Sequence, residues 1–146
     1  MTSVGFFAGS ASSGSTMLAV STSKLLADMG KRVLHIFSGI SSLYSYVEKN
    51  NAGSLDDIKS SLVGRSLTEE EIKATAKTVG GIELIASNKS FIMANTFPVD
   101  SFEQILNSSR CFDYVVVDAG SDFRTALTVS ALCYCNKRIV SITQEP

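Results

Sequence analysis

Short apolar runs alternate along this chain with segments of helical periodicity. Between the runs, apolar residues recur every three or four positions, as they do over 15–29. Strands that alternate with helices are typical of an α/β domain with a largely parallel sheet. We therefore expect a doubly wound parallel sheet of about five strands flanked by helices. The expected strands are 3–8, 32–37, 82–86, 114–117 and 138–143.

Capping patterns indicate where the expected helices begin. A capping box, in which a side chain at the helix start is followed three residues later by an acid, occurs at Thr68 with Glu71 and at Asp100 with Glu103. The helix after Thr68 is expected to continue through Val79 and to end at the glycine pair that follows. A last helix is expected over 123–135.

Length and charge limit the classes of function. The chain has 146 residues, of which 45% are hydrophobic, so we expect one domain over 1–146 with a substantial core. The formal net charge is −1 and the basic residues are scattered, which argues against direct nucleic-acid binding. No apolar run approaches the roughly 20 residues that span a bilayer, and no leader pattern is present. We expect no transmembrane segment and a cytoplasmic location.

The cysteines and the single histidine show no metal-site pattern. Cys111, Cys133 and Cys135 lack C-x-x-C spacing, so we expect reduced thiols that pack as small apolar groups. His35 lies inside an apolar run and is expected to be a strand residue with a satisfied ring. Tyr44, Tyr46 and 91–93 lie in segments without clear periodicity, where core packing is expected.

A glycine-bracketed loop directly follows the first expected strand. Its sequence, GSASSGST, has the length, the two glycines and the terminal hydroxyl of a phosphate-binding P-loop. In that loop, backbone N–H groups hold phosphates, a lysine meets their charge and the hydroxyl holds Mg²⁺. Ser15 stands in the place of the lysine. The candidate nucleotide- or phosphate-binding residues are Gly9, Ser10, Ala11, Ser12, Ser13, Gly14, Ser15 and Thr16.

Purely structural roles remain open for these residues. Gly9 and Gly14 also suit a tight turn between a strand and a helix. Ser15 and Thr16 also suit helix capping. Asp118 ends an apolar strand just before a glycine, so it is a candidate metal ligand and equally a candidate cap for the last helix or its preceding turn.

Four motifs together carry a resemblance to a known family. They are the loop at Gly9, the segment Gly30-Lys31-Arg32-Val33-Leu34, the segment Gly81-Ile82-Glu83-Leu84-Ile85-Ala86, and Phe112-Asp113-Tyr114-Val115-Val116-Val117-Asp118. In this order the chain resembles the ParA/MinD superfamily of P-loop ATPases. Within it, the chain looks most like the CpaE/TadZ branch of pilus-assembly positioning proteins. The resemblance implies a parallel sheet with nucleotide at the C-terminal edge of the strands, in a domain truncated relative to the family.

The resemblance extends to some of the family's functional positions. Gly9, Gly14 and Thr16 match its first glycine, its second glycine and its Mg²⁺ hydroxyl, and Asp118 matches its Walker B aspartate. It therefore implies a Mg²⁺ site at Thr16 and Asp118. ATP and Mg²⁺ are the implied cofactors, expected to bind weakly or not at all for the reasons that follow.

At other positions the chain departs from the family pattern. Ser10 and Ser15 replace its two lysines, and Ala11 and Ser12 replace glycines. After the second strand, the positions that carry catalytic aspartates in the family are occupied by Phe37 and Gly39. Phosphoryl transfer depends on positioning and on charge stabilisation, so these losses argue against rapid hydrolysis and leave a degenerate Walker A motif.

Three functions are compatible with this pattern. The leading hypothesis is a domain with little or no catalysis that serves as a positioning or assembly scaffold, in pilus or secretion machinery or in a partitioning-like role. It would act as a homodimer or by docking onto a protein partner. The second is an ATPase that uses a lysine supplied in trans or from elsewhere in the chain. The third is a nucleotide or phosphate sensor without turnover.

Overall fold

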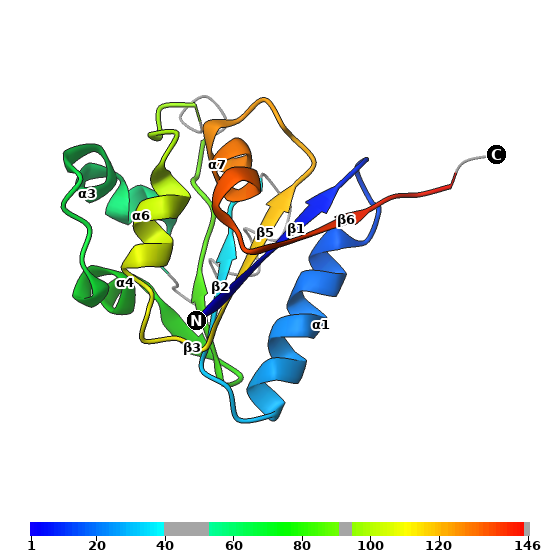
Figure 1. The fold of residues 1–146 in the computed structure, drawn as a ribbon, viewed down its shortest axis with the longest axis horizontal. Helices are drawn as coiled ribbons and strands as arrows, with labels where there is room; N and C mark the ends of the chain where they lie inside the picture. The colour runs from blue at the N-terminus through cyan, green and yellow to red at the C-terminus, as the bar shows by residue number, and fades with distance from the viewer. Residues whose placement is uncertain (40–52, 91–94, 145–146) are drawn as a thin grey trace.

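The computed structural model describes residues 1–39, 53–90 and 95–144, which form a central sheet between helices (Figure 1). Tyr44, Tyr46 and the segment 91–93 lie outside the described residues. In chain order the elements are β1 (Thr2–Ala8), α1 (Ser15–Asp28), β2 (Val33–Phe37), η1 (Leu55–Ile58), α3 (Lys59–Gly64), α4 (Glu69–Thr75), β3 (Lys77–Val79), β4 (Ile82–Ile85), α6 (Ser101–Asn107), β5 (Tyr114–Gly120), α7 (Ala126–Tyr134) and β6 (Lys137–Ser141).

The described residues form one six-stranded sheet in the order β3-β4-β2-β5-β1-β6. Every pairing is parallel except that of β3 with β4. Among the described helices, α1 covers one face, and α6 and α7 lie on the other (Figure 1). The predicted α/β class with a largely parallel sheet is confirmed, and the described sheet has one strand more than the five expected.

The additional strand is β3, which the sequence analysis assigned to a helix. The helix that starts after Thr68 ends at Thr75, and the chain then forms an antiparallel hairpin with β4. Gly80 and Gly81 have φ angles of 58° and 82° and form its turn. Two consecutive positive φ angles are typical of the tight turn that joins two strands, so the glycine pair is a hairpin signal and not a helix stop.

The two predicted capping boxes differ in outcome. The Thr68 hydroxyl accepts a hydrogen bond from the Glu71 amide, and the Glu71 carboxylate accepts one from the Thr68 amide, as predicted. The Asp100 prediction is wrong, because its carboxylate makes no cap and instead pairs with Arg65 at 3.1 Å.

Two apolar layers fix the position of the sheet. On one face, Phe7, Leu34 and Val117 are fully buried in the cluster that includes α6 and α7 residues. On the other face, Phe6 and Val116 pack beneath α1. Because strands β1, β5 and β2 are parallel neighbours, their carboxyl ends meet at one edge. The loop after β1 and Asp118 therefore come together.

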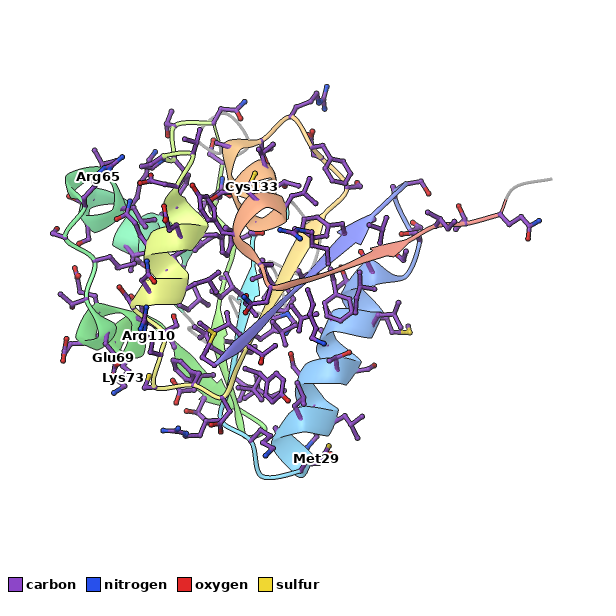
Figure 2. All side chains as sticks on the ribbon, in the orientation of Figure 1. Met29, Arg65, Glu69, Lys73, Arg110 and Cys133 are labelled. Carbon is purple, nitrogen blue, oxygen red and sulfur yellow. The ribbon has the colours of Figure 1, made fainter. Side chains whose placement is uncertain are left out.

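The cysteines are all free thiols. Cys135 is buried, as expected, and burial raises the pKa of its thiol to about 12. Cys133 is exposed on α7 (Figure 2), so the expectation that it packs as an apolar group is wrong.

His35 connects β2 to α1 inside the second apolar layer. Its Nδ1 lies 2.7 Å from the Ser23 hydroxyl, and its ring centroid lies 4.3 Å from that of Phe37, with the two rings tilted by 48°. The expectation of a satisfied ring holds only in part, because Nε2 has no hydrogen-bond partner within residues 1–39, 53–90 and 95–144. Burial lowers the pKa of His35 to about 3, so the ring stays neutral in the folded protein near neutral pH.

We predict an acid-sensitive stability that depends on His35. Its folded pKa is below its unfolded value of 6.5, so the stabilisation is complete above pH 6.5 and decreases as pH falls toward 3. Between pH 7 and pH 5 we expect a loss of about 2 kcal/mol in the free energy of unfolding. Urea titrations of wild type and His35→Asn at several pH values measure this loss. If the free energy of unfolding changed with pH by the same amount in both proteins, the pH dependence would not arise from His35.

Candidate functional site

The glycine-bracketed loop lies at the C-terminal edge of the sheet, between β1 and α1. β1 ends at Ala8, and α1 begins at Ser15 with Gly14 at its N-cap position. The start of α1 has no side-chain cap. Ser15 and Thr16 are thus not N-caps, and the positive end of the helix dipole is available to an anion.

The loop retains a strained backbone at one non-glycine residue. Gly14 has a φ of 83°, which glycine adopts freely, and Ser12 has a φ of 63°. Ser12 is one of the positions expected to be glycine in a family loop. A left-handed conformation costs a residue with a Cβ roughly 1–2 kcal/mol, so this serine keeps a glycine-like backbone at an energetic cost.

Several loop groups are bonded to the end of β6. The Gly9 amide donates to the Ser141 carbonyl at 2.8 Å. The Ser13 hydroxyl lies 2.7 Å from that of Ser141, and the Ser10 hydroxyl lies 3.2 Å from that of Thr143. Gly9, Ser10, Ile142 and Thr143 line a hollow of about 340 Å³ at this junction. Ser10 and Ser13 therefore anchor the loop to β6.

Thr16 and Asp118 lie together beneath the loop. Asp118 is on the α1 side of the sheet, in register with Phe6, and is only 3% exposed. Burial raises the pKa of its carboxyl group, while hydrogen bonds from the Thr16 hydroxyl and the Gly120 amide lower it. Among the residues that the structure describes, its Oδ1 has no hydrogen-bond partner. Thr125 caps α7, so the alternative that Asp118 caps this helix is wrong, whereas the hydrogen bond from the Gly120 amide is consistent with a role in the turn before the helix.

A buried carboxylate oxygen without a hydrogen-bond partner, next to a hydroxyl group, is suited to bind a metal ion. Thr16 and Asp118 fit that role, whereas Gly9 to Ser15 carry no cation for phosphate charge. Among residues 1–39, 53–90 and 95–144, no group of three or more His, Cys, Asp or Glu side chains is placed to hold a metal. An ion here would depend on phosphate or water for its remaining ligands.

The positions after β2 have packing roles. Phe37 is 7% exposed beneath α1, and its ring packs at a tilt against that of His35. Gly39 lies against Gly120, so a Cβ on Gly39 would be 2.9 Å from the Cα and N atoms of Gly120. The structure has no room for an aspartate at position 39 unless the end of β5 moves.

The loop after β5 adds two residues that the sequence analysis did not single out. Phe123 stacks on Phe7 with 6.1 Å between ring centroids, which holds this loop near the end of β1. Arg124 is exposed, but Asp122 accepts two hydrogen bonds from its guanidinium group, at 2.9 and 3.1 Å. In the sequence, the signal for these two residues was an aromatic residue and an arginine shortly after the aspartate that ends the apolar strand.

The sheet order, the loop between β1 and α1, and Asp118 at the end of β5 define a P-loop NTPase-like fold. Solved structures of ParA and MinD proteins share this fold. A ParA family ATPase from Chlorobium tepidum TLS matches with a TM-score of 0.77 and 16% identity, over 95% of this chain and 59% of that chain. A putative plasmid partition protein from Borrelia burgdorferi B31 bound to AMPPNP matches at 0.70 and 16%, over 96% and 60%. The MinC:MinD complex of Aquifex aeolicus matches at 0.68 and 18%, over 96% and 55%.

These likenesses establish the fold. The chain spans between 55% and 60% of those three solved chains. No family model matches the sequence, and no curated protein matches it. Among the helices that the structure describes, none is long and apolar enough to cross a membrane.

Proposed function

We propose that this chain is a degenerate ParA/MinD-like domain, closest to the CpaE/TadZ branch, that acts in the cytoplasm as a positioning or assembly scaffold. It binds nucleotide weakly or not at all, hydrolyses it slowly or not at all, and works through a protein partner or a second copy. Pilus assembly, secretion and partitioning are the processes that use such scaffolds in the family that the sequence resembles.

The observation that supports this proposal is that the loop region keeps two residues suited to hold a metal ion but has no lysine to bind phosphate. Thr16 and the buried Asp118 remain together below an uncapped helix start. The helix end supplies roughly half a positive charge, whereas a nucleoside triphosphate carries several negative charges. Ser10 and Ser15 leave the difference uncompensated, so we expect some anion affinity and no rapid turnover.

Two of the structural neighbours support the identity of the ligand and the kind of partner. The Borrelia partition protein was solved with AMPPNP, so ATP is the nucleotide to test here. The Aquifex MinD protein was solved in complex with MinC, so a protein partner on this fold is a reasonable expectation for the scaffold.

A sensor that binds nucleotide without turnover is the second candidate. The conformation of Ser12 favours it, because a strained loop residue persists where an anion would meet the backbone. Tight binding combined with no hydrolysis would distinguish the sensor from the scaffold.

Thermal unfolding with and without 1 mM Mg-ATP, beside a phosphate-release assay, tests the proposal. For a Kd at or above about 1 mM, the ligand stabilises the fold by at most about 0.4 kcal/mol, which shifts the Tm by about 1–2 °C. Phosphate release is expected to equal that of buffer. Thr16→Val, which keeps the side-chain shape and removes the hydroxyl, should abolish the small shift.

Two outcomes would contradict the scaffold proposal. A Tm shift of several degrees without phosphate release would support the sensor. Phosphate release that Asp118→Asn abolishes would show an active ATPase whose cation comes from outside the loop.

A further inference from the structure

α1 presents an apolar strip to solvent on one of its flanks. Leu18, Leu25 and Met29 are 48%, 63% and 64% exposed, and Thr22 lies between them on the same flank. We call Leu18, Leu25 and Met29 the α1 strip. Their spacings of seven and four residues place them along one line of the helix, as at the seam between two packed helices. Figure 2 labels Met29 at the C-terminal end of α1.

The strip faces the β6 edge of the sheet. Ala19 and Ser23 of α1 are fully buried, and the strip lies about a quarter turn of the helix away from them. The chain passes from β1 through α1 to β2 as a right-handed crossover. In that geometry the flank of the strip points toward β6, and the opposite flank points toward β4.

β6 continues the same apolar surface onto the sheet. It is the outermost strand, next to β1. Ile139 is in register with Phe6, whose side chain packs under α1, so Ile139 lies on the α1 side of the sheet. It is 43% exposed. Lys137, in register with Val4, is exposed on the same side and has no ion-pair partner in the described part of the chain.

The space beside the strip has the width of one helix. α1 packs mainly on β5 and also on β1 and β2, and among the described helices it is alone on this face (Figure 1). Two strand spacings, about 9.6 Å, separate β5 from β6. Packed helices lie about 8–10 Å apart, so a helix beside α1 would lie above β6. We call this surface, formed by the α1 strip and Ile139, the α1–β6 trough.

We propose that the α1–β6 trough is a docking site for an amphipathic helix of a partner protein. The helix places apolar residues at heptad-like spacing against the strip and Ile139, and an acidic residue against Lys137. The inference rests on the proposed scaffold function and names the surface through which the scaffold meets its partner.

A second copy of the chain fits this surface less well. Two β6 edges could pair, but the two α1 helices would then be five strand spacings, about 24 Å, apart. Leu18, Leu25 and Met29 would stay uncovered. Among the described residues, Lys137 is the charged group that lies on the sheet side of the trough, and a second copy would place neutral or basic β6 residues opposite this cation.

A labelled model peptide tests the site on the intact chain. The peptide is a helix of about 15 residues, the length of α1, with leucines at heptad spacing and glutamates beside them. Fluorescence anisotropy measures its Kd, and amide chemical shifts map its position, which we expect on α1 and β6. Leu25→Glu is expected to weaken binding at least about tenfold. Val63→Glu, at a 61% exposed site on α3, is the matched control and should not.

Charge reversal makes the test specific. Lys137→Glu should weaken the glutamate peptide and strengthen a peptide with lysines in those places. The proposal would be overturned if the peptide did not bind, if Leu25→Glu and Val63→Glu weakened binding equally, or if the chemical-shift changes were confined to other elements. It would also be overturned if the chain self-associated and Leu25→Glu abolished that association, because a second copy would then occupy the trough. These results do not depend on Mg-ATP, so they can fail while the nucleotide assays succeed.

Discussion

Gly39→Ala is expected to lower the free energy of unfolding by about 3 kcal/mol, the upper range for overpacking a buried site. The new Cβ would lie 2.9 Å from the Cα and N atoms of Gly120 and 3.0 Å from the carbonyl carbon of Ala119. All of these are backbone atoms. The Ser38 and Gly39 amides both donate to the Asp118 carbonyl, at 2.9 and 3.1 Å, so the two strand ends cannot separate without losing hydrogen bonds.

Urea titration measures this effect, with Gly64→Ala as the matched control. Gly64 ends α3, and a Cβ there would meet nothing closer than the Ser66 hydroxyl at 3.5 Å. Alanine at a helical glycine is expected to be neutral or to stabilise by up to about 1 kcal/mol. If Gly39→Ala does not lower the free energy of unfolding relative to Gly64→Ala, the close approach of β2 and β5 is not a constraint, and our explanation for the missing aspartate is wrong.

The sequence was sufficient to predict those elements whose signal lies in neighbouring residues. The β5 strand is a run of buried valines, and the Thr68 capping box fixes the start of α4, so both could be predicted from neighbouring residues. β3 was missed because Lys77 to Val79 is too short to show a period. Its strand conformation depends on pairing with β4 across Gly80 and Gly81.

The candidate site was predictable in its parts and not in its contacts. Thr16 and Asp118 were identified from the loop and the strand end, and the fold brings them together. The contacts of Ser10 and Ser13 with β6 link residues more than 120 positions apart, which no local pattern encodes. The approach of Gly39 to Gly120 is equally nonlocal.

The positions at which the chain departs from the pattern of the family that it resembles have structural roles. Phe37 fills the layer beneath α1 against His35, and Gly39 allows β2 and β5 to approach. The hydroxyl of Ser10 contacts the segment after β6. Placing the family's residues at these three positions would therefore disturb packing, whereas a lysine at position 15 would break no side-chain hydrogen bond or ion pair within the described part of the chain. Ser15 is the position at which catalytic charge can be returned most directly.

Ser15→Lys is expected to tighten Mg-ATP binding about 30-fold, or about 2 kcal/mol, the scale of a hydrogen bond to a charged group. Ser15 is 5% exposed at the first position of α1, so the ammonium group should also destabilise the protein without nucleotide. The signature is thus a lower Tm in buffer together with a larger Tm rise on adding Mg-ATP. Isothermal titration calorimetry gives the two Kd values.

Ser15→Met separates charge from bulk, because methionine adds a long unbranched side chain without the ammonium group. It should lower the Tm in buffer through crowding, yet leave Mg-ATP affinity at the wild-type level. Should lysine and methionine give the same affinity, the loop does not direct position 15 toward phosphate, and its likeness to a P-loop is one of backbone shape alone. A gain in affinity with lysine and no gain in phosphate release would place the remaining catalytic deficit at Phe37 and Gly39, where the structure leaves no aspartate to organise the attacking water.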